Sequence, residues 1–184
     1  MANQATKTVN GIPMDILENT VESIKKEPKL AKSKFHISNK WVSGGQNQTT
    51  ITSFYSSGRE NFHKRTFTLQ SDEPELLAGN DTSPNPVEHL LNALAGCLTS
   101  SMVYHAAVNG INIYEVESEV EGDIDLRGFM GLAEDIRKGY NKINVRFRVK
   151  SDSENTEQLK SLAKFSPVLD VVSNGTKVDI SISS

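Results

Sequence analysis

One side chain in this sequence stands out for covalent or redox chemistry, the thiol of Cys97. It is the chain's single cysteine, and a cysteine reacts as its thiolate with oxidants, disulfides and electrophiles. The four histidines show no metal-ligand spacing relative to each other or to Cys97, so we expect no metal. The sequence also lacks a phosphate-binding glycine loop and a Gly-x-Ser-x-Gly elbow. We therefore expect no cofactor.

The immediate sequence around Cys97 offers little to activate the thiol. Ser100 and Ser101 follow at helical spacing, but they carry no charge. Glu88 and His105 lie two turns or more away along the same predicted helix, roughly 12 Å or more along its axis. A group that activates the thiol would have to come from a residue distant in the sequence that folding brings close to Cys97. Two interpretations stay open: Cys97 reacts, or it is a small apolar side chain in the core.

A long helix positions Cys97. Residues 86–108 are mostly apolar; Asn85 can cap the start, with Pro86 at the first helical position, and Asn109-Gly110 is typical of a C-terminal end. Such a helix would span roughly 34 Å. Its apolar side chains surround it, and one sheet can cover only one face. We therefore expect a central buried helix covered in part by a second chain, in a homodimer.

The first half of the chain predicts a helix followed by a β-meander. The first ten residues resemble a loose tail, and a helix is expected from Pro13 to about Glu27. Residues 1–33 would thus form a tail and an extension helix, and 34–184 a single domain. Strands are expected at the ranges 34–42, 49–55 and 65–69, separated by glycine-rich turns, with a loop over 72–86 before the long helix.

The second half predicts a charged strand pair. Glutamates and aspartates alternate with apolar residues from Glu115 to Asp125, and lysines and arginines do so from Lys142 to Lys150. Adjacent strands with these faces would pair acid with base on an exposed sheet face. A short helix over 155–165 and a closing strand over 176–183 complete an α+β fold of antiparallel sheets.

Composition limits the classes of function. The chain has 184 residues, 20 basic and 23 acidic, for a net charge of −3. Such a balance favours neither nucleic acid nor a membrane surface as a partner. A single cysteine excludes an internal disulfide, and the polar N-terminal residues do not resemble a signal peptide. We expect a cytoplasmic protein.

Three stretches together resemble the OsmC/Ohr family, the osmotically induced protein C and organic hydroperoxide resistance proteins. The resemblance covers roughly residues 33–184 and includes the order of strands and helices. Its motifs are Asn85-Pro86-Val87-Glu88-His89-Leu90-Leu91 with Ala95-Gly96-Cys97, Asp125-Leu126-Arg127-Gly128-Phe129, and Ser166-Pro167-Val168. The resemblance implies an OsmC-like fold, an intertwined homodimer with long helices at its centre, and thiol peroxidase chemistry.

Only some of the family's functional residues are present at the matching positions of this sequence. Cys97 matches the attacking cysteine, but Ser166 stands where the resolving cysteine is usual, and serine forms no disulfide. The family's glutamate aligns with Val87, or with Glu88 after a shift of one residue. The family's arginine is missing from the Gly44-Gly45 turn, and Arg59, Arg65, Arg127 and Arg137 are the candidates to replace it.

Two functions follow from this pattern. The first is a one-cysteine peroxidase that reduces organic hydroperoxides through Cys97, with Glu88 assisting and an external thiol as reductant. The second is a non-catalytic dimer that binds an apolar small molecule in a pocket containing Phe129, Met130 and Tyr104. An inert core cysteine in a purely structural dimer is a third interpretation.

Overall fold

The computed structural model describes residues 7–183, which divide into two compact units: residues 13–90 with residue 7, and residues 8–12 with 91–183. Residues 1–6 of the expected tail lie outside the described residues. The rest of that tail is ordered, against expectation. Strands β1 (Thr8–Val9) and β2 (Ile12–Pro13) form a hairpin whose turn is Asn10-Gly11, both with positive φ. Asn-Gly is a preferred pair for such turns.

The first unit begins with the expected helix and continues as the expected meander. Helix α1 spans Met14–Lys26, followed by the 3-10 turn η1 (Pro28–Ala31). The sheet contains β3 (Lys34–Phe35), β4 (Ser38–Ser43), β5 (Gln46–Ser56) and β6 (Arg59–Ser71), all antiparallel to their neighbours. Strands β3 and β4 are two pieces of the single strand expected over 34–42, and both pair with the same edge of β5.

A buried carboxylate organises the loop between β6 and the long helix. Asp72 is fully buried. Its Oδ2 accepts hydrogen bonds from the Thr82 hydroxyl at 2.7 Å and the Thr82 backbone N–H at 3.2 Å, and Oδ1 accepts from the Glu73 N–H at 2.8 Å. The Thr82 hydroxyl, chief among these donors, holds the pKa of Asp72 well below its usual range. A Cβ at Gly79 would lie 1.8 Å from the Glu73 carbonyl oxygen, so this close loop requires glycine.

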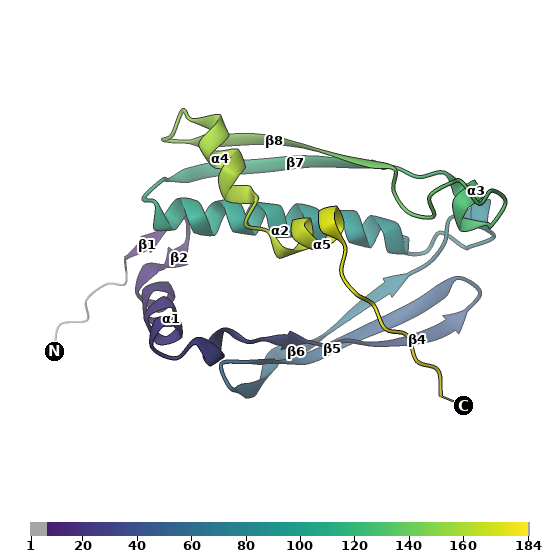
Figure 1. Cartoon of the computed structure of the whole chain (residues 1–184), viewed down its shortest axis with the longest axis horizontal. Helices are drawn as coiled ribbons and strands as arrows, with labels where there is room; N and C mark the ends of the chain where they lie inside the picture. Colours follow the sequence, from purple (N-terminus) through teal and green to yellow (C-terminus); the bar gives the residue numbers. More distant parts are fainter. Residues whose placement is uncertain (1–6, 184) are drawn as a thin grey trace. The chain divides into compact units, whose positions relative to one another are not determined.

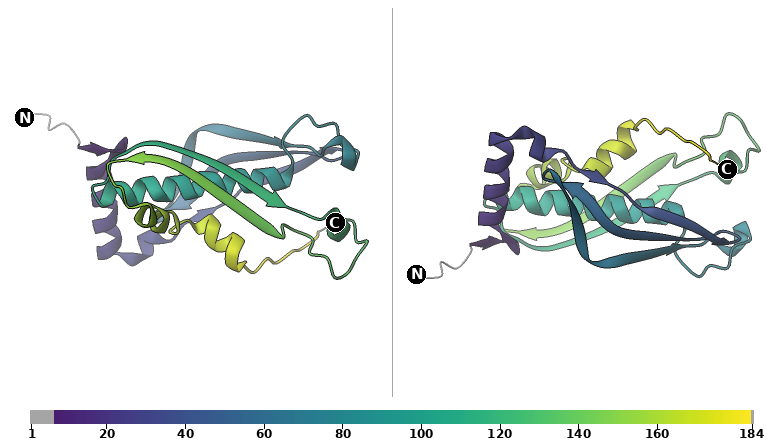
Figure 2. Two further views of the ribbon diagram at one scale, coloured as in Figure 1. Left: turned by 90° about the horizontal axis from the view of Figure 1, so that it is seen from above. Right: turned by 90° about the horizontal axis from the view of Figure 1, so that it is seen from below.

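The second unit is built around helix α2 (Pro86–Val108), which has the bounds expected from the sequence. Strands β7 (Ile113–Asp123) and β8 (Lys142–Ser151) form an antiparallel ribbon that runs along α2 (Figures 1 and 2). Leu94, Leu98 and Met102 of α2 form the core with side chains of β8 and of α4 (Thr156–Ala163). The spacing of four residues places these side chains on one face of the helix. The expected α+β fold with antiparallel sheets is confirmed.

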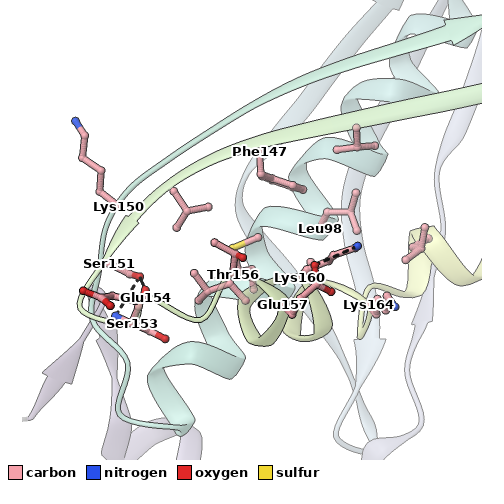
Figure 3. A pocket seen from close by; sticks show the side chains of 16 residues that line it. Leu98, Phe147, Lys150, Ser151, Ser153, Glu154, Thr156, Glu157, Lys160 and Lys164 are labelled. Carbon is pink, nitrogen blue, oxygen red and sulfur yellow. Dashed lines mark hydrogen bonds and ion pairs between the residues drawn. The ribbon is translucent and has the colours of Figure 1, made fainter.

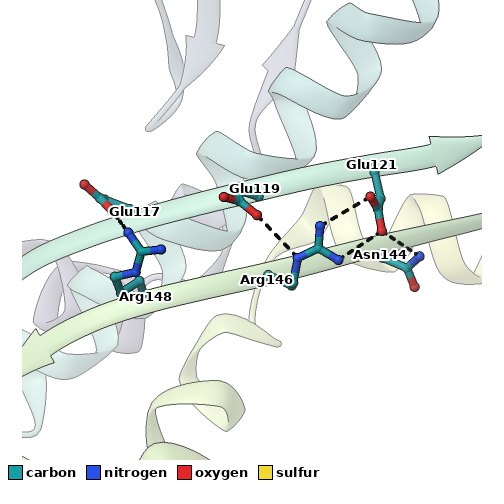
Figure 4. Close-up of polar contacts among 6 residues, drawn as sticks. All are labelled: Glu117, Glu119, Glu121, Asn144, Arg146 and Arg148. Atoms are coloured by element: carbon teal, nitrogen blue, oxygen red, sulfur yellow. Dashed lines mark hydrogen bonds and ion pairs between the residues drawn. The ribbon is translucent and has the colours of Figure 1, made fainter.

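The charged ribbon follows the predicted pairing. Glu117 lies opposite Arg148, and Glu119 opposite Arg146. Arg148 contacts Glu117 at 2.7 Å, and Arg146 contacts Glu121 at 3.1 Å and Glu119 at 3.4 Å (Figure 4). All these side chains are exposed, so each pair contributes only about 0.2–1 kcal/mol. Their alternation mainly fixes the register, since a shift of one residue would bring these charges to the core face.

In the second unit, three elements differ from the sequence expectation. Helix α3 (Leu126–Phe129) lies in the long connection after β7, and helix α5 (Pro167–Asn174) begins at the proline that was expected to end a helix. Proline at a first helical position starts a helix as readily as it stops the preceding one. The strand expected over 176–183 is wrong: these residues form no ladder, and Ile180 is 85% exposed. A β-pattern needs a partner edge for its backbone groups.

Across residues 7–183, no helix combines the length and apolar character needed to cross a membrane.

Candidate functional site

Cys97 lies near the middle of α2 and is partly exposed. It is the twelfth residue of the helix, roughly 16 Å along the axis from the start and far beyond the first turn. Leu94 and Leu98 on the adjacent face are buried, whereas Ala93, Gly96 and Ser100 are exposed. Cys97 thus stands at the border between the packed face of α2 and a face of small, open side chains, where the thiol can meet a small molecule.

Glu88 is engaged at the start of the helix. The Asn85 side-chain oxygen accepts hydrogen bonds from the N–H groups of Val87 at 2.9 Å and Glu88 at 3.2 Å. In return, the Glu88 carboxylate accepts from the Asn85 N–H at 2.8 Å. This reciprocal pair is a capping box. Nine residues separate Glu88 from Cys97, roughly 13 Å along the axis. The structure therefore brings Glu88 to Asn85 and not to the thiol of its own chain.

Ser166 performs a structural task at the position usual for a second cysteine. The side chain is 1% exposed. It caps helix α5, where its hydroxyl accepts a hydrogen bond from the Leu169 N–H at 3.1 Å, and Pro167 occupies the first helical position. A serine cap of this kind stabilises a helix by about 1 kcal/mol. A nucleophilic role would require a base at the hydroxyl, and the contact observed there is a backbone donor.

Two of the arginines named from the sequence have contacts of their own. Arg127 forms a two-pronged ion pair with Asp125, with Arg127 Nη2 2.5 Å and Nε 3.1 Å from Asp125 Oδ2. Hydrogen bonds from the Arg127 side chain, and then from its backbone N–H, lower the pKa of Asp125 to about 2. Arg65 lies over the ring of Phe67, 5.6 Å from its centroid. None of these contacts involves Cys97.

The three side chains expected to line a pocket do not gather in one place. Phe129 is 62% exposed and Met130 49%, at and just after α3, and Tyr104 is 49% exposed near the end of α2. Helix α3 lies at the opposite end of the second unit from the last turns of α2 (Figures 1 and 2). Two of these side chains thus belong to the connection after β7 and the third to the far end of the helix.

The second unit instead contains a cavity of about 740 Å³ between β8 and α4, with α2 at its base. Its apolar wall includes Leu98 and Met102 of α2, Phe147 and Val149 of β8, and Leu159 of α4 (Figure 3). Polar side chains occupy the rim. Leu98 follows Cys97 directly, but Cys97 itself does not line the cavity. The volume is in the usual range for small-molecule sites.

The sequence did not predict this cavity, because the residues that form its walls have the apolar pattern of ordinary core residues. The alternating apolar residues of β8 and the amphipathic pattern of α4 predict that both elements are half buried. They do not predict that α4 stands away from β8 and leaves a space between them.

A second polar group in the first unit resembles a catalytic arrangement but lacks its geometry. His36 Nε2 lies 3.1 Å from the Ser53 hydroxyl and 3.8 Å from the Glu60 carboxylate. Both neighbours contact the same ring nitrogen. In a serine–histidine–acid triad they would contact opposite nitrogens, so that the acid orients the base. We interpret the group as a set of polar contacts that stabilises the sheet. Within residues 7–183, no cluster of three or more His, Cys, Asp or Glu side chains could hold a metal ion.

Comparison with known proteins assigns the chain to a family. The model of the OsmC-like protein family matches residues 79–181, which include α2, the charged ribbon and α5. The chain therefore belongs to the OsmC-like family. A search of curated protein sequences finds no significant match.

Solved structures agree on the fold. An OsmC-like protein from Mycoplasma pneumoniae shares 18% sequence identity, with a TM-score of 0.56 over 77% of this chain and 88% of that one. A protein from Psychrobacter arcticus described as an osmotic stress induced and detoxification response protein gives 13% identity and a TM-score of 0.56, covering 76% and 88%. An OsmC-like protein from Vibrio cholerae gives 11% and 0.51, covering 80% and 96%.

Proposed function

We propose that this protein is a one-cysteine, thiol-dependent reductase of organic hydroperoxides, with Cys97 as the attacking residue. The observation that carries the proposal is the place of Cys97: a partly exposed thiol in the middle of the long helix of an OsmC-like chain. It coincides with the position that the family resemblance gives to the attacking cysteine. The same thiol buried inside the core would be out of reach of any peroxide.

The proposed reaction has two stages. The Cys97 thiolate attacks one peroxide oxygen, the O–O bond breaks, and the alkoxide leaves as an alcohol after taking a proton, so that the sulfur becomes a sulfenic acid. An external thiol then attacks that sulfur and releases water, which gives a mixed disulfide. A second thiol attacks the mixed disulfide and restores Cys97. Overall, two thiols are oxidised to a disulfide and one hydroperoxide is reduced to an alcohol and water.

Ser166 supports the one-cysteine form of this cycle. Because the position of the second cysteine is occupied by a buried helix cap, the sulfenic acid cannot be resolved within the chain. The reductant must then be a diffusible thiol or a thiol protein. A cytoplasmic location is part of the proposal, and the need for a reduced thiol partner supports it, because thiols are kept reduced in that compartment.

A homodimer is part of the proposal. Helix α2 has a packed face and an exposed one, and the exposed face carries the small side chains of Ala93, Gly96 and Ser100 beside Tyr104. Small side chains allow the close approach of a second helix. A second copy could also bring to Cys97 the charged partner that its own helix does not supply. Sedimentation velocity would test this arrangement, and a single monomeric species at micromolar concentration would contradict it.

The experiment for the enzyme proposal is direct. Purified protein is mixed with cumene hydroperoxide, and sulfenic acid at Cys97 is trapped with dimedone and measured by mass spectrometry across pH 5–9. We expect trapping far faster than with free cysteine, followed by turnover when a dithiol is added. Oxidation no faster than that of free cysteine would exclude the proposal.

A second candidate function is the binding of an apolar small molecule without catalysis, and the cavity beside α4 favours it. That cavity is formed by residues of one unit and does not include the thiol. Native mass spectrometry of freshly purified protein is the test. A copurified small molecule of constant mass would support binding, and repeated spectra of the bare chain after incubation with apolar ligands would count against it.

A further inference from the structure

The wall and the mouth of the α4 cavity differ in chemistry. The wall is formed by aliphatic, aromatic and thioether side chains from four elements, α2, β8, α4 and α5, among them Met102, Val145 and Leu169. An apolar cavity of about 740 Å³ can hold a hydrocarbon chain or a ring system, and burial of that surface would favour binding by about 25 cal/mol per Å² of apolar area. The wall alone therefore selects for apolar bulk and not for a particular head group.

On the α4 side, the side chains at the mouth of the cavity carry an excess of positive charge. Lys160 lies on α4, Lys164 caps the C-terminal end of that helix, and both line the cavity. Lys160 has an exposed contact with Glu157 at 3.6 Å, whereas Lys164 has no ion pair among the described residues (Figure 3). Two cations thus face one carboxylate on this side.

The opposite side of the mouth carries the opposite excess charge. Lys150 is neutralised by its contact with Glu115 across the ribbon, and Figure 3 shows its side chain pointing away from the cavity. Glu154 lines this side and carries a negative charge. An anionic head group would therefore be favoured beside Lys164 and disfavoured beside Glu154.

We propose that the α4 cavity binds an anionic amphiphile, with its hydrocarbon chain against Phe147 and Met102 and its head group beside Lys164. The inference rests on the binding function proposed above and specifies the class of its ligand. It assigns no role to Cys97, since the thiol does not line the cavity. The occupant is a free small molecule of the fatty-acid type.

One other occupant has to be distinguished. Residues 176–183 carry Val178, Ile180 and Ile182 at alternate positions, all exposed and without a strand partner among the described residues. Such a segment can add to a sheet edge and insert its apolar side chains into a groove. If it filled the cavity, it would exclude an amphiphile.

The experiment is calorimetric titration of the full chain with two probes of equal chain length, sodium decanoate and decyltrimethylammonium bromide, each below its micellar concentration. We expect one decanoate per chain, bound about fivefold or more tightly than the cation, which corresponds to about 1 kcal/mol. Lys164→Glu should weaken decanoate and strengthen the cation. Lys138→Glu, the same charge change at an exposed residue outside the cavity, is the matched control and should change neither.

Each contrary outcome has its own meaning. Equal affinity for the two probes would overturn the anionic class and leave apolar binding in place. Failure of both probes would overturn binding itself; if decanoate then bound to the Ile180→Asp variant, the chain's own C-terminal segment would be the occupant. Cys97→Ser should bind decanoate as wild type does. Loss of decanoate binding in this variant would show that the binding site includes the thiol. Circular dichroism of each variant confirms that the fold is retained.

Discussion

Cys97 and Ser166 occupy the two positions at which the family resemblance places sulfur, and their surroundings are opposite. Cys97 lies in the middle of a helix and is partly exposed. Ser166 lies at the start of a helix, 1% exposed, and its hydroxyl satisfies the Leu169 N–H. The comparison shows that the Cys97 side chain is accessible for reaction, whereas the Ser166 side chain stabilises the fold. Activity and stability should therefore respond to different substitutions.

The largest effect is expected at Cys97. Replacing the thiol by a hydroxyl of similar size removes the nucleophile, so Cys97→Ser should lower hydroperoxide turnover by at least about 100-fold. The melting temperature should change little, since the side chain is only partly buried. Turnover is measured by following loss of cumene hydroperoxide in the presence of a dithiol. Wild-type turnover in this variant would show that Cys97 is not the nucleophile.

Ser166 should give the reverse result. Ser166→Ala removes the cap of α5 and leaves the Leu169 N–H without its partner, which should lower the free energy of unfolding by about 1–2 kcal/mol. For a chain of this length, each kcal/mol corresponds to about 2–4 °C in melting temperature. Ser161→Ala, an exposed serine on α4, is the control and should change stability by less than about 0.5 kcal/mol. A large loss of turnover in Ser166→Ala at unchanged stability would contradict the structural role.

Glu88 distinguishes helix capping from a direct action on the thiol. Asn85→Ala should destabilise the protein by about 1 kcal/mol, whereas Glu88→Gln should cost less than about 0.5 kcal/mol because glutamine can still accept from the Asn85 N–H. Neither substitution should change the rate of Cys97 oxidation more than about twofold. Urea unfolding and dimedone trapping are measured on the same samples. A tenfold slower oxidation in Glu88→Gln would place this carboxylate at a thiol, across a dimer.

The smallest effect concerns pH, and it defines where thiol reactivity can be measured without unfolding. Asp125 has a pKa of about 2 in the folded protein, below its usual value of 3.8. Its contribution to stability is therefore fully present above about pH 5 and is lost as the pH falls toward about 2. Asp72 and Glu121, whose pKa values are also lowered, act in the same direction. Urea unfolding should give a constant free energy between pH 5 and 8.

A substitution isolates the part that belongs to Asp125. Asp125→Asn still accepts from the Arg127 N–H but loses the charge, so its stability should fall less steeply below pH 4 than that of wild type. A fall of wild-type stability between pH 7 and 5 would mean that another group dominates, and the pH profile of Cys97 oxidation would then need correction for unfolding.

The sequence by itself determined the local features of this protein. The bounds of α2 follow from a capping asparagine, a proline and a terminal Asn-Gly, all within one turn of the ends they define. The register of the β7–β8 ribbon follows from alternating charge, because any odd shift would bury carboxylates and guanidinium groups. The position of Cys97 on a long apolar helix was likewise fixed by residues near it in the chain.

Only the tertiary structure decided what each side chain contacts. Ser166 was expected as a vacant cysteine position and is a buried cap, because Pro167 begins a new helix there. The cavity beside α4 depends on the separation of two elements that no local pattern encodes. Residues 176–183 have a strand pattern but form no strand, since β-pairing is completed by a second edge. Local spacing sets helices and register, whereas sites arise where distant elements meet.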